Sequence, residues 1–143
     1  MDIFNLYLSV PVTYCREAYS LEKQLGDQGY GVCNPCRIII PDLPKEKLPS
    51  YIAVECYRLI EISNAIILFS DYYGRDCSAE IGYAVGRKKP IFPFSAKGID
   101  SSNLEQDWMI RPMLQPLSKS FNELLNNLVN VYESLEEKYG QQS

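Results

Sequence analysis

The sequence contains no histidine. Imidazole is the usual base that activates serine and cysteine nucleophiles, so its absence excludes Ser–His and Cys–His mechanisms. It also removes the ligand that completes mixed cysteine–histidine zinc sites. Catalysis in this chain must therefore depend on carboxylates, tyrosines, cysteines or backbone dipoles, and we expect neither a metal nor another cofactor.

Long runs of basic residues and long runs of apolar residues are also missing. The net charge is −4 without a long basic run, which disfavours binding to nucleic acid or to an anionic membrane. The apolar runs are too short to span a bilayer, and the first residues lack the basic segment of a signal peptide. With 143 residues, 46% of them hydrophobic, we expect one cytoplasmic domain over residues 1–143 with a frayed tail at 139–143.

The cysteines are five in number, which is odd for a disulfide framework. We therefore expect no disulfide in a chain of this apparent compartment. Cys33 and Cys36 have the C-x-x-C spacing of zinc and redox sites, but no second pair follows, so we interpret the spacing as coincidence. Cys56 and Cys77 are expected to be small packing residues.

Strand-like and helix-like segments alternate along the chain. Short apolar runs predict four strands, at residues 3–10, 30–33, 64–69 and 90–94. Apolar residues at helical spacing predict four helices, at residues 13–28, 50–62, 79–87 and 120–139. Such alternation predicts an α/β fold, a flavodoxin-like or Rossmann-like doubly wound and mostly parallel sheet with helices on both faces. The proline-rich loop at residues 34–49 is expected to be functional.

The spacing within the helices also predicts caps and buried positions. Thr13 should cap the first helix, which buries Ala18, Leu21 and Leu25 and ends before Gly29. The second helix should bury five residues, Tyr51, Ile52, Val54, Leu59 and Ile62. Ser120 should cap the last helix, with Glu123 at capping-box spacing. The inner stripe of that helix is Leu124, Leu128, Val131 and Leu135.

The polar stretch from Ser70 to Ala84 leaves the end of one predicted strand and enters a helix. Ligands of open parallel sheets bind at this edge. We place Glu80 in the first turn of that helix, where the dipole and the unpaired N–H groups favour an ionised carboxylate. An ionised carboxylate at the mouth of a cleft can act as a nucleophile, and Glu80 is the principal candidate.

Several motifs in order resemble the nucleoside 2-deoxyribosyltransferase superfamily, which includes transferases and related N-glycoside hydrolases. The resemblance covers residues 7–113 and rests on Tyr7-Leu8-Ser9, Asn64-Ala65, the segment from Asp76 to Ala84, and Lys89-Pro90. It implies that Glu80 forms a covalent glycosyl intermediate, which a base or water resolves. It also implies that Tyr7 orients the carboxylate, and that Asp71 or Asp76 contacts the sugar or protonates the leaving base.

The same stretch supplies candidate substrate contacts. Ser9 and Ser78 lie where a sugar could be bound, Gly74 lies in the loop, and Arg75 can bind an anion or pair with a neighbouring aspartate. By the resemblance, a neighbouring subunit completes the pocket with Asp107, Trp108 and Met109. We therefore expect a homo-oligomer with a shared active site and a small nucleoside or nucleotide substrate. The aromatic and apolar rim also includes Tyr72, Tyr73, Ile110 and Met113.

The chain departs from the family pattern at three places. Cys56 stands where the family has an aspartate, and the adjacent Glu55 should point elsewhere on its helix. Asp107 replaces an asparagine, and Val10-Pro11-Val12 replaces a glycine-rich turn. Two other functions remain open. The segment from Arg75 to Glu80 also resembles the Ser/Cys-x-x-Glu stretch of TIR domains, which implies an NAD glycohydrolase. A non-catalytic nucleotide-sensing module is the second alternative.

Overall fold

The computed structural model describes residues 3–71, 74–100 and 107–140. Its strands are β1 (Asn5–Ser9), β2 (Gly31–Cys33), β3 (Ala65–Phe69) and β4 (Ile91–Phe94). Its α-helices are α1 (Cys15–Asp27), α2 (Leu48–Glu61), α3 (Arg75–Gly86) and α5 (Phe121–Gly140). Four short 3-10 turns lie between them: η1 (Val12–Tyr14), η2 (Pro35–Arg37), η3 (Lys45–Lys47) and η4 (Arg111–Met113). Tyr72, Tyr73 and residues 101–106 lie outside the described residues.

The four strands form one parallel sheet in the order β2-β1-β3-β4. Beyond β4, Leu114 and Ser118 make single parallel bridges to Ile91 and Phe94, in the position of a fifth strand. This order is the flavodoxin-like one, so the predicted fold class is confirmed. The chain winds outward in both directions from the β1–β3 pair, and such a switch point opens a crevice at the strands' carboxyl ends.

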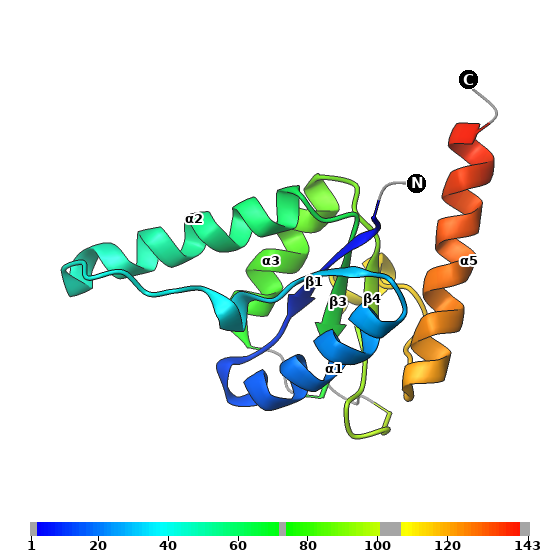
Figure 1. Ribbon diagram of the computed structural model, residues 1–143, viewed down its shortest axis with the longest axis horizontal. Coiled ribbons are helices and arrows are strands. Elements are labelled where there is room, and N and C mark those ends of the chain that lie inside the picture. The colour runs from blue at the N-terminus through cyan, green and yellow to red at the C-terminus, as the bar shows by residue number, and fades with distance from the viewer. Residues whose placement is uncertain (1–2, 72–73, 101–106, 141–143) are drawn as a thin grey trace.

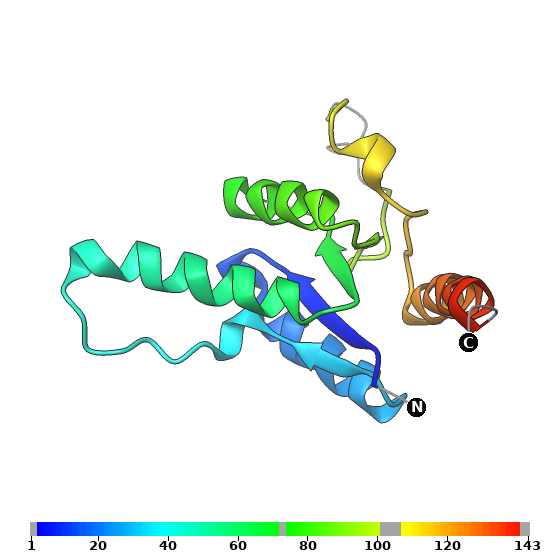
Figure 2. The ribbon, with the colours of Figure 1, turned by 90° about the horizontal axis from the view of Figure 1, so that it is seen from above.

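Helices cover both faces of the sheet (Figures 1 and 2), and alternate residues of the strands pack against opposite layers. Leu6 and Leu8 of β1 pack in a cluster with α1 and α5. Tyr7 of β1 packs in a second cluster with Ile60 of α2 and with residues of α3. The odd positions of β1, including Ser9, therefore point to the α2–α3 layer.

Two helix caps differ in outcome. Ser120 Oγ accepts a hydrogen bond of 3.2 Å from the backbone N–H of Glu123, so the predicted cap of α5 is confirmed. Thr13 caps nothing, because it lies inside η1 and α1 begins only at Cys15 with no side-chain cap. The buried positions predicted in α1 are confirmed, as are Leu124 and Leu128 of α5. Leu135 lies outside the described side chains.

The buried face predicted for α2 is largely wrong. Ile60 is the buried residue of this helix, whereas Ile52, Val54 and Ile62 are exposed. The reason is visible in Figures 1 and 2, where the first half of α2 and the chain before it project beyond the sheet. Apolar side chains on this half therefore have no strand to cover.

A disulfide joins Cys15 to Cys36, with the Cα atoms 5.9 Å apart, so the expectation of no disulfide is wrong. The bond links the start of α1 to η2, two segments 21 residues apart in the sequence. Parallel pairing of β1 with β2 brings these segments together, which the spacing of cysteines alone does not reveal. Within residues 3–71, 74–100 and 107–140, no helix is long and apolar enough to cross a membrane.

Candidate active site

Glu80 lies in the second turn of α3 rather than in its first, which corrects the sequence expectation. The helix begins at Arg75 after Gly74, whose backbone is extended, and Asp76 is the acidic residue of the first turn. The sequence prediction starts the helix at residue 79 because residues 76 and 78 are polar and were assigned to a loop, whereas both lie inside the helix. Because the free N–H groups and the dipole act within the first turn, they do not hold Glu80 ionised.

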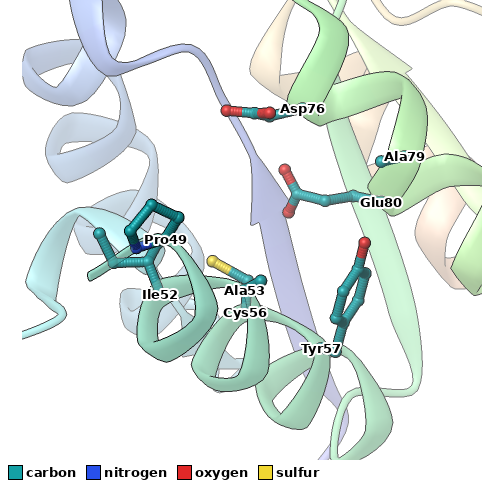
Figure 3. Close-up of a pocket in the computed structure, with 8 residues that line it drawn as sticks. All are labelled: Pro49, Ile52, Ala53, Cys56, Tyr57, Asp76, Ala79 and Glu80. Atoms are coloured by element: carbon teal, nitrogen blue, oxygen red, sulfur yellow. The ribbon is translucent and has the colours of Figure 1, made fainter. Parts of the chain in front are cut away.

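A cleft at the carboxyl end of β1 lies between α2 and α3, and Glu80 lines it (Figure 3). Its first lobe, about 290 Å³, is lined by Pro49, Ile52, Ala53, Cys56, Tyr57, Asp76, Ala79 and Glu80. Its second lobe, about 280 Å³, shares Ile52, Cys56, Asp76 and Glu80 with the first and extends to Tyr7 and to the loops after β1 and β2. The shared residues make the two lobes parts of one cleft of ligand size.

The Glu80 carboxylate is buried, and one of its oxygens has no hydrogen-bond partner in the described part of the chain. The residue is 9% exposed, and Oε2 has no hydrogen-bond partner among the described residues. Burial raises the pKa of Glu80 from 4.5 to about 7, although the Tyr7 and Ser9 hydroxyls partly oppose this rise. Near neutral pH both protonation states are populated, so an ionised carboxylate is available there as a nucleophile.

Tyr7 and Ser9 face the same carboxylate from β1. Both are fully buried, and neither hydroxyl has a partner that meets hydrogen-bond geometry among the described residues. They nevertheless lie close enough to Glu80 to lower its pKa. Burial, and then the negative charge of Glu80, raises the pKa of Tyr7, so its hydroxyl stays protonated and is available as a donor.

The two aspartates that the sequence left undecided are separated by the structure. Asp76 lines both lobes beside Glu80. The Asp71 carboxylate instead accepts hydrogen bonds from Ser95 Oγ at 2.6 Å and from the backbone N–H groups of Ala96 at 2.8 Å and Lys97 at 3.3 Å. Asp71 therefore ties the end of β3 to the segment after β4, and its oxygens are occupied away from the cleft.

The other candidates lie around the cleft rather than in it. Arg75 is exposed at the start of α3 and lines neither lobe. Ser78 Oγ donates to the carbonyl of Gly74 at 3.4 Å. Trp108 and Met109, after Asp107, are 84% and 86% exposed and lie outside this chain's cleft.

The sequence reading missed the wall that α2 contributes. Pro49, Ile52, Ala53, Cys56 and Tyr57 line the first lobe, and their spacing is that of one helical face. This spacing was the available signal, but the buried face predicted from the sequence includes only Ile52 of these residues, and Cys56 is given a packing role.

Cys56, interpreted from the sequence as a packing residue, borders both lobes of the cleft. Figure 3 shows its sulfur on the side of α2 that faces Glu80. Burial raises the pKa of the Cys56 thiol, so a protonated, uncharged group stands there. Glu55 turns away as expected, pairing with Arg58 at 2.9 Å in a separate groove.

Comparisons with solved structures identify the fold. A 2-deoxyribosyltransferase from Bacillus psychrosaccharolyticus superimposes with a TM-score of 0.69 at 18% identity, covering 84% of this chain and 89% of that one. A CMP N-glycosidase from Clostridium botulinum gives 0.56 at 17% identity, covering 87% and 97%. A conserved protein from Enterococcus faecalis V583 gives 0.55 at 14% identity, covering 99% and 100%. No family model and no curated protein matches the sequence. The predicted resemblance is thus confirmed at the level of the fold.

Proposed function

We propose that this protein cleaves or transfers the N-glycosidic bond of a (deoxy)nucleoside or nucleotide, with Glu80 as the nucleophile. The observation that carries the proposal is the buried Glu80 carboxylate, whose Oε2 has no hydrogen-bond partner among the described residues and which lines a ligand-sized cleft beside the switch point of the sheet. A buried carboxylate oxygen without a partner is costly, which supports a functional role for this residue. The likeness to a deoxyribosyltransferase and to an N-glycosidase supports this class of reaction.

In the proposed first step, a Glu80 oxygen attacks the anomeric carbon of the sugar. The bond from that carbon to the base nitrogen breaks, its electron pair leaves with the base, and a sugar ester of Glu80 forms. In the second step a free base or water attacks the same carbon, and the ester bond breaks. The nucleophile is thereby regenerated, and the acceptor decides between transfer and hydrolysis.

The neighbouring groups have separate roles in this scheme. Tyr7 and Ser9 present hydroxyls that orient the ionised carboxylate and stabilise it. Asp76, which lines both lobes, takes the place of the acidic residue that contacts the sugar or gives a proton to the departing base. Asp71 is not assigned this role because its carboxylate is already bound to the chain after β4.

The test is product analysis by chromatography after incubation with a panel of nucleosides, their monophosphates and NAD, with and without a second free base. We expect release of a base, an exchanged nucleoside when a second base is present, and a sugar adduct on acid-quenched protein by mass spectrometry. Glu80→Gln should lose turnover by more than tenfold, about 1.4 kcal/mol of barrier, and should lose the adduct. Glu55→Gln, a change of the same kind on the far side of α2, is the matched control and should keep both.

The outcomes of this panel separate the alternatives. Turnover of Glu80→Gln within tenfold of wild type contradicts the nucleophile. Nicotinamide release from NAD without reaction of any nucleoside or nucleotide favours the TIR-like alternative. Saturable nucleotide binding without any reaction favours a sensing module.

We further propose that the active site is shared in a homo-oligomer, with Asp107, Trp108 and Met109 reaching the Glu80 of a neighbouring subunit. The support is that the last two side chains are almost fully exposed in the single chain. Monomers rarely expose a large aromatic and a methionine side by side without a binding role.

A further inference from the structure

The second lobe of the cleft has more and larger aliphatic side chains than the first. Besides Glu80, the three neighbours of Glu80 that can hydrogen-bond (Tyr7, Cys56 and Asp76) and Cys36 of the disulfide, its walls are Val10, Val12, Pro35, Ile38, Ile40 and Ile52, the last of which it shares with the first lobe. None of these six side chains carries a donor or an acceptor. We propose that this lobe holds the leaving base, and that the preferred base carries an apolar substituent. The inference rests on the proposed function and specifies its substrate class.

The first lobe suits the sugar better, because the Tyr57 hydroxyl lines that lobe alone, whereas the Tyr7 hydroxyl of the second lobe faces Glu80. Sugar hydroxyls need hydrogen-bond partners, and the first lobe offers the Tyr57 hydroxyl and the Asp76 carboxylate next to Glu80. The second lobe opens at the same carboxylate, because Glu80 and Asp76 line both. A sugar held in the first lobe therefore directs its base toward the aliphatic walls.

Aliphatic walls discriminate between bases because they offer no hydrogen-bond partner to a polar group. A polar edge of a base placed against these side chains gives up its hydrogen bonds to water and receives none in return from them. An apolar substituent in the same place removes its own surface and that of the walls from water. The lobe should therefore discriminate in favour of a base with a benzyl-sized substituent over the unsubstituted base.

One wall of this lobe is held in place by a covalent bond. Cys36 lines it and is joined to Cys15 at the start of α1, so η2 is anchored to the body of the protein at this wall. A wall that is already ordered binds an apolar group without the entropic cost of ordering that wall during binding. The adjacent Ile39 and Ile40 turn to opposite sides, since Ile40 lines the lobe while Ile39 lines the separate groove beside Arg58.

The experiment measures binding without turnover, by calorimetry on Glu80→Gln protein. The probes are two matched pairs: 2′-deoxyadenosine with its 6-N-benzyl derivative, and 2′-deoxyuridine with its 5-benzyl derivative. We expect the benzyl member of at least one pair to bind tenfold or more tightly than its parent. Adding Ile40→Ser should reduce this preference at least threefold, whereas adding Ile39→Ser should not change it. Both isoleucines are exposed, at 63% and 83%, so neither change should prevent folding.

The readouts separate this inference from the proposed reaction. If neither pair shows the preference, or if the two serine variants reduce it equally, the inference is overturned. If wild-type protein cleaves the parent nucleosides and yet no preference is found, the inference alone fails. If the preference is found but wild-type protein cleaves none of the four probes, the lobe assignment stands and the proposed reaction fails for these substrates.

Discussion

Replacing Glu80 by glutamine should stabilise the protein above neutral pH, and by an amount that depends on pH. Burial raises the pKa of Glu80 from 4.5 to about 7, so the folded protein prefers the protonated carboxyl. Below pH 4.5 the group is protonated in both the folded and the unfolded states and costs nothing. As the pH rises from 4.5 to 7, the unfolded state releases the proton while the folded state retains it, and stability is lost. Above pH 7 both states are ionised and the loss is complete.

The size of the effect follows from the two pKa values. Each pH unit between them changes the free energy of unfolding by about 1.4 kcal/mol, so the full loss is about 3 kcal/mol. Glutamine has nearly the same shape and stays neutral at every pH. The difference in unfolding free energy between Glu80→Gln and wild type should therefore be constant below pH 4, increase by about 2 kcal/mol by pH 6, and level off about 3 kcal/mol higher above pH 7.

The assay is urea unfolding of both proteins at intervals from pH 4 to pH 9, followed by far-UV circular dichroism. Glu46→Gln is the control, because Glu46 is exposed in η3 and its charge stays in water in both states. A difference between Glu80→Gln and wild type that does not change with pH, or that falls as the pH rises, would refute the reasoning. It would show that Glu80 is not held in an environment that disfavours its charge.

Three further predictions concern the substrate, Asp71 and the neighbouring subunit. No lysine or arginine in the described part of the chain lines either lobe, while Asp76 and Glu80 line both. A nucleoside 5′-monophosphate should therefore be turned over with a kcat/KM at least tenfold below that of its nucleoside, because its charge is repelled. Equal kcat/KM values would contradict this prediction. Asp71→Ala should lower the free energy of unfolding by about 3 kcal/mol, because the Ser95 hydroxyl and the Ala96 N–H lose their hydrogen-bond acceptor. Turnover per folded molecule should stay within about twofold of wild type. Urea unfolding checks the first part, and rates normalised to folded protein check the second. Mixing inactive Glu80→Ala with inactive Asp107→Ala protein should restore part of the activity if the pocket is shared, and no recovery after demonstrated subunit exchange would exclude sharing.

The sheet was predictable because its signals are local. Short apolar runs separated by helical periodicity predict a parallel sheet, and the right-handed crossover rule then fixes which helices share a face. The errors arise where the answer depends on contacts between distant segments. The disulfide between Cys15 and Cys36 depends on which strands pair, and the exposure of Ile52 and Val54 depends on how far α2 extends beyond the sheet.

The candidate site was predictable in part, and chiefly from the resemblance, which implies that Tyr7 orients the Glu80 carboxylate. Ser9 was expected only where a sugar could be bound, whereas the structure brings both hydroxyls to Glu80, because residues 7 and 9 lie on the same face of β1. The choice between Asp71 and Asp76 was not accessible from spacing. It depends on the direction in which the chain leaves β3, which sends the Asp71 carboxylate to the segment after β4.

Cys56 has a place in the electrostatics of this site. Its thiol borders the cleft beside Glu80, and burial raises its pKa, so it adds no charge there near neutral pH. A carboxylate in its place would stand near Glu80, and two carboxylates so close cannot both ionise readily, which would raise the pKa of Glu80 above about 7. With cysteine there, Tyr7 and Ser9 are the groups on β1 that lower the pKa of Glu80, and both favour its ionised form. The departure at Cys56 is therefore compatible with the proposed role of Glu80.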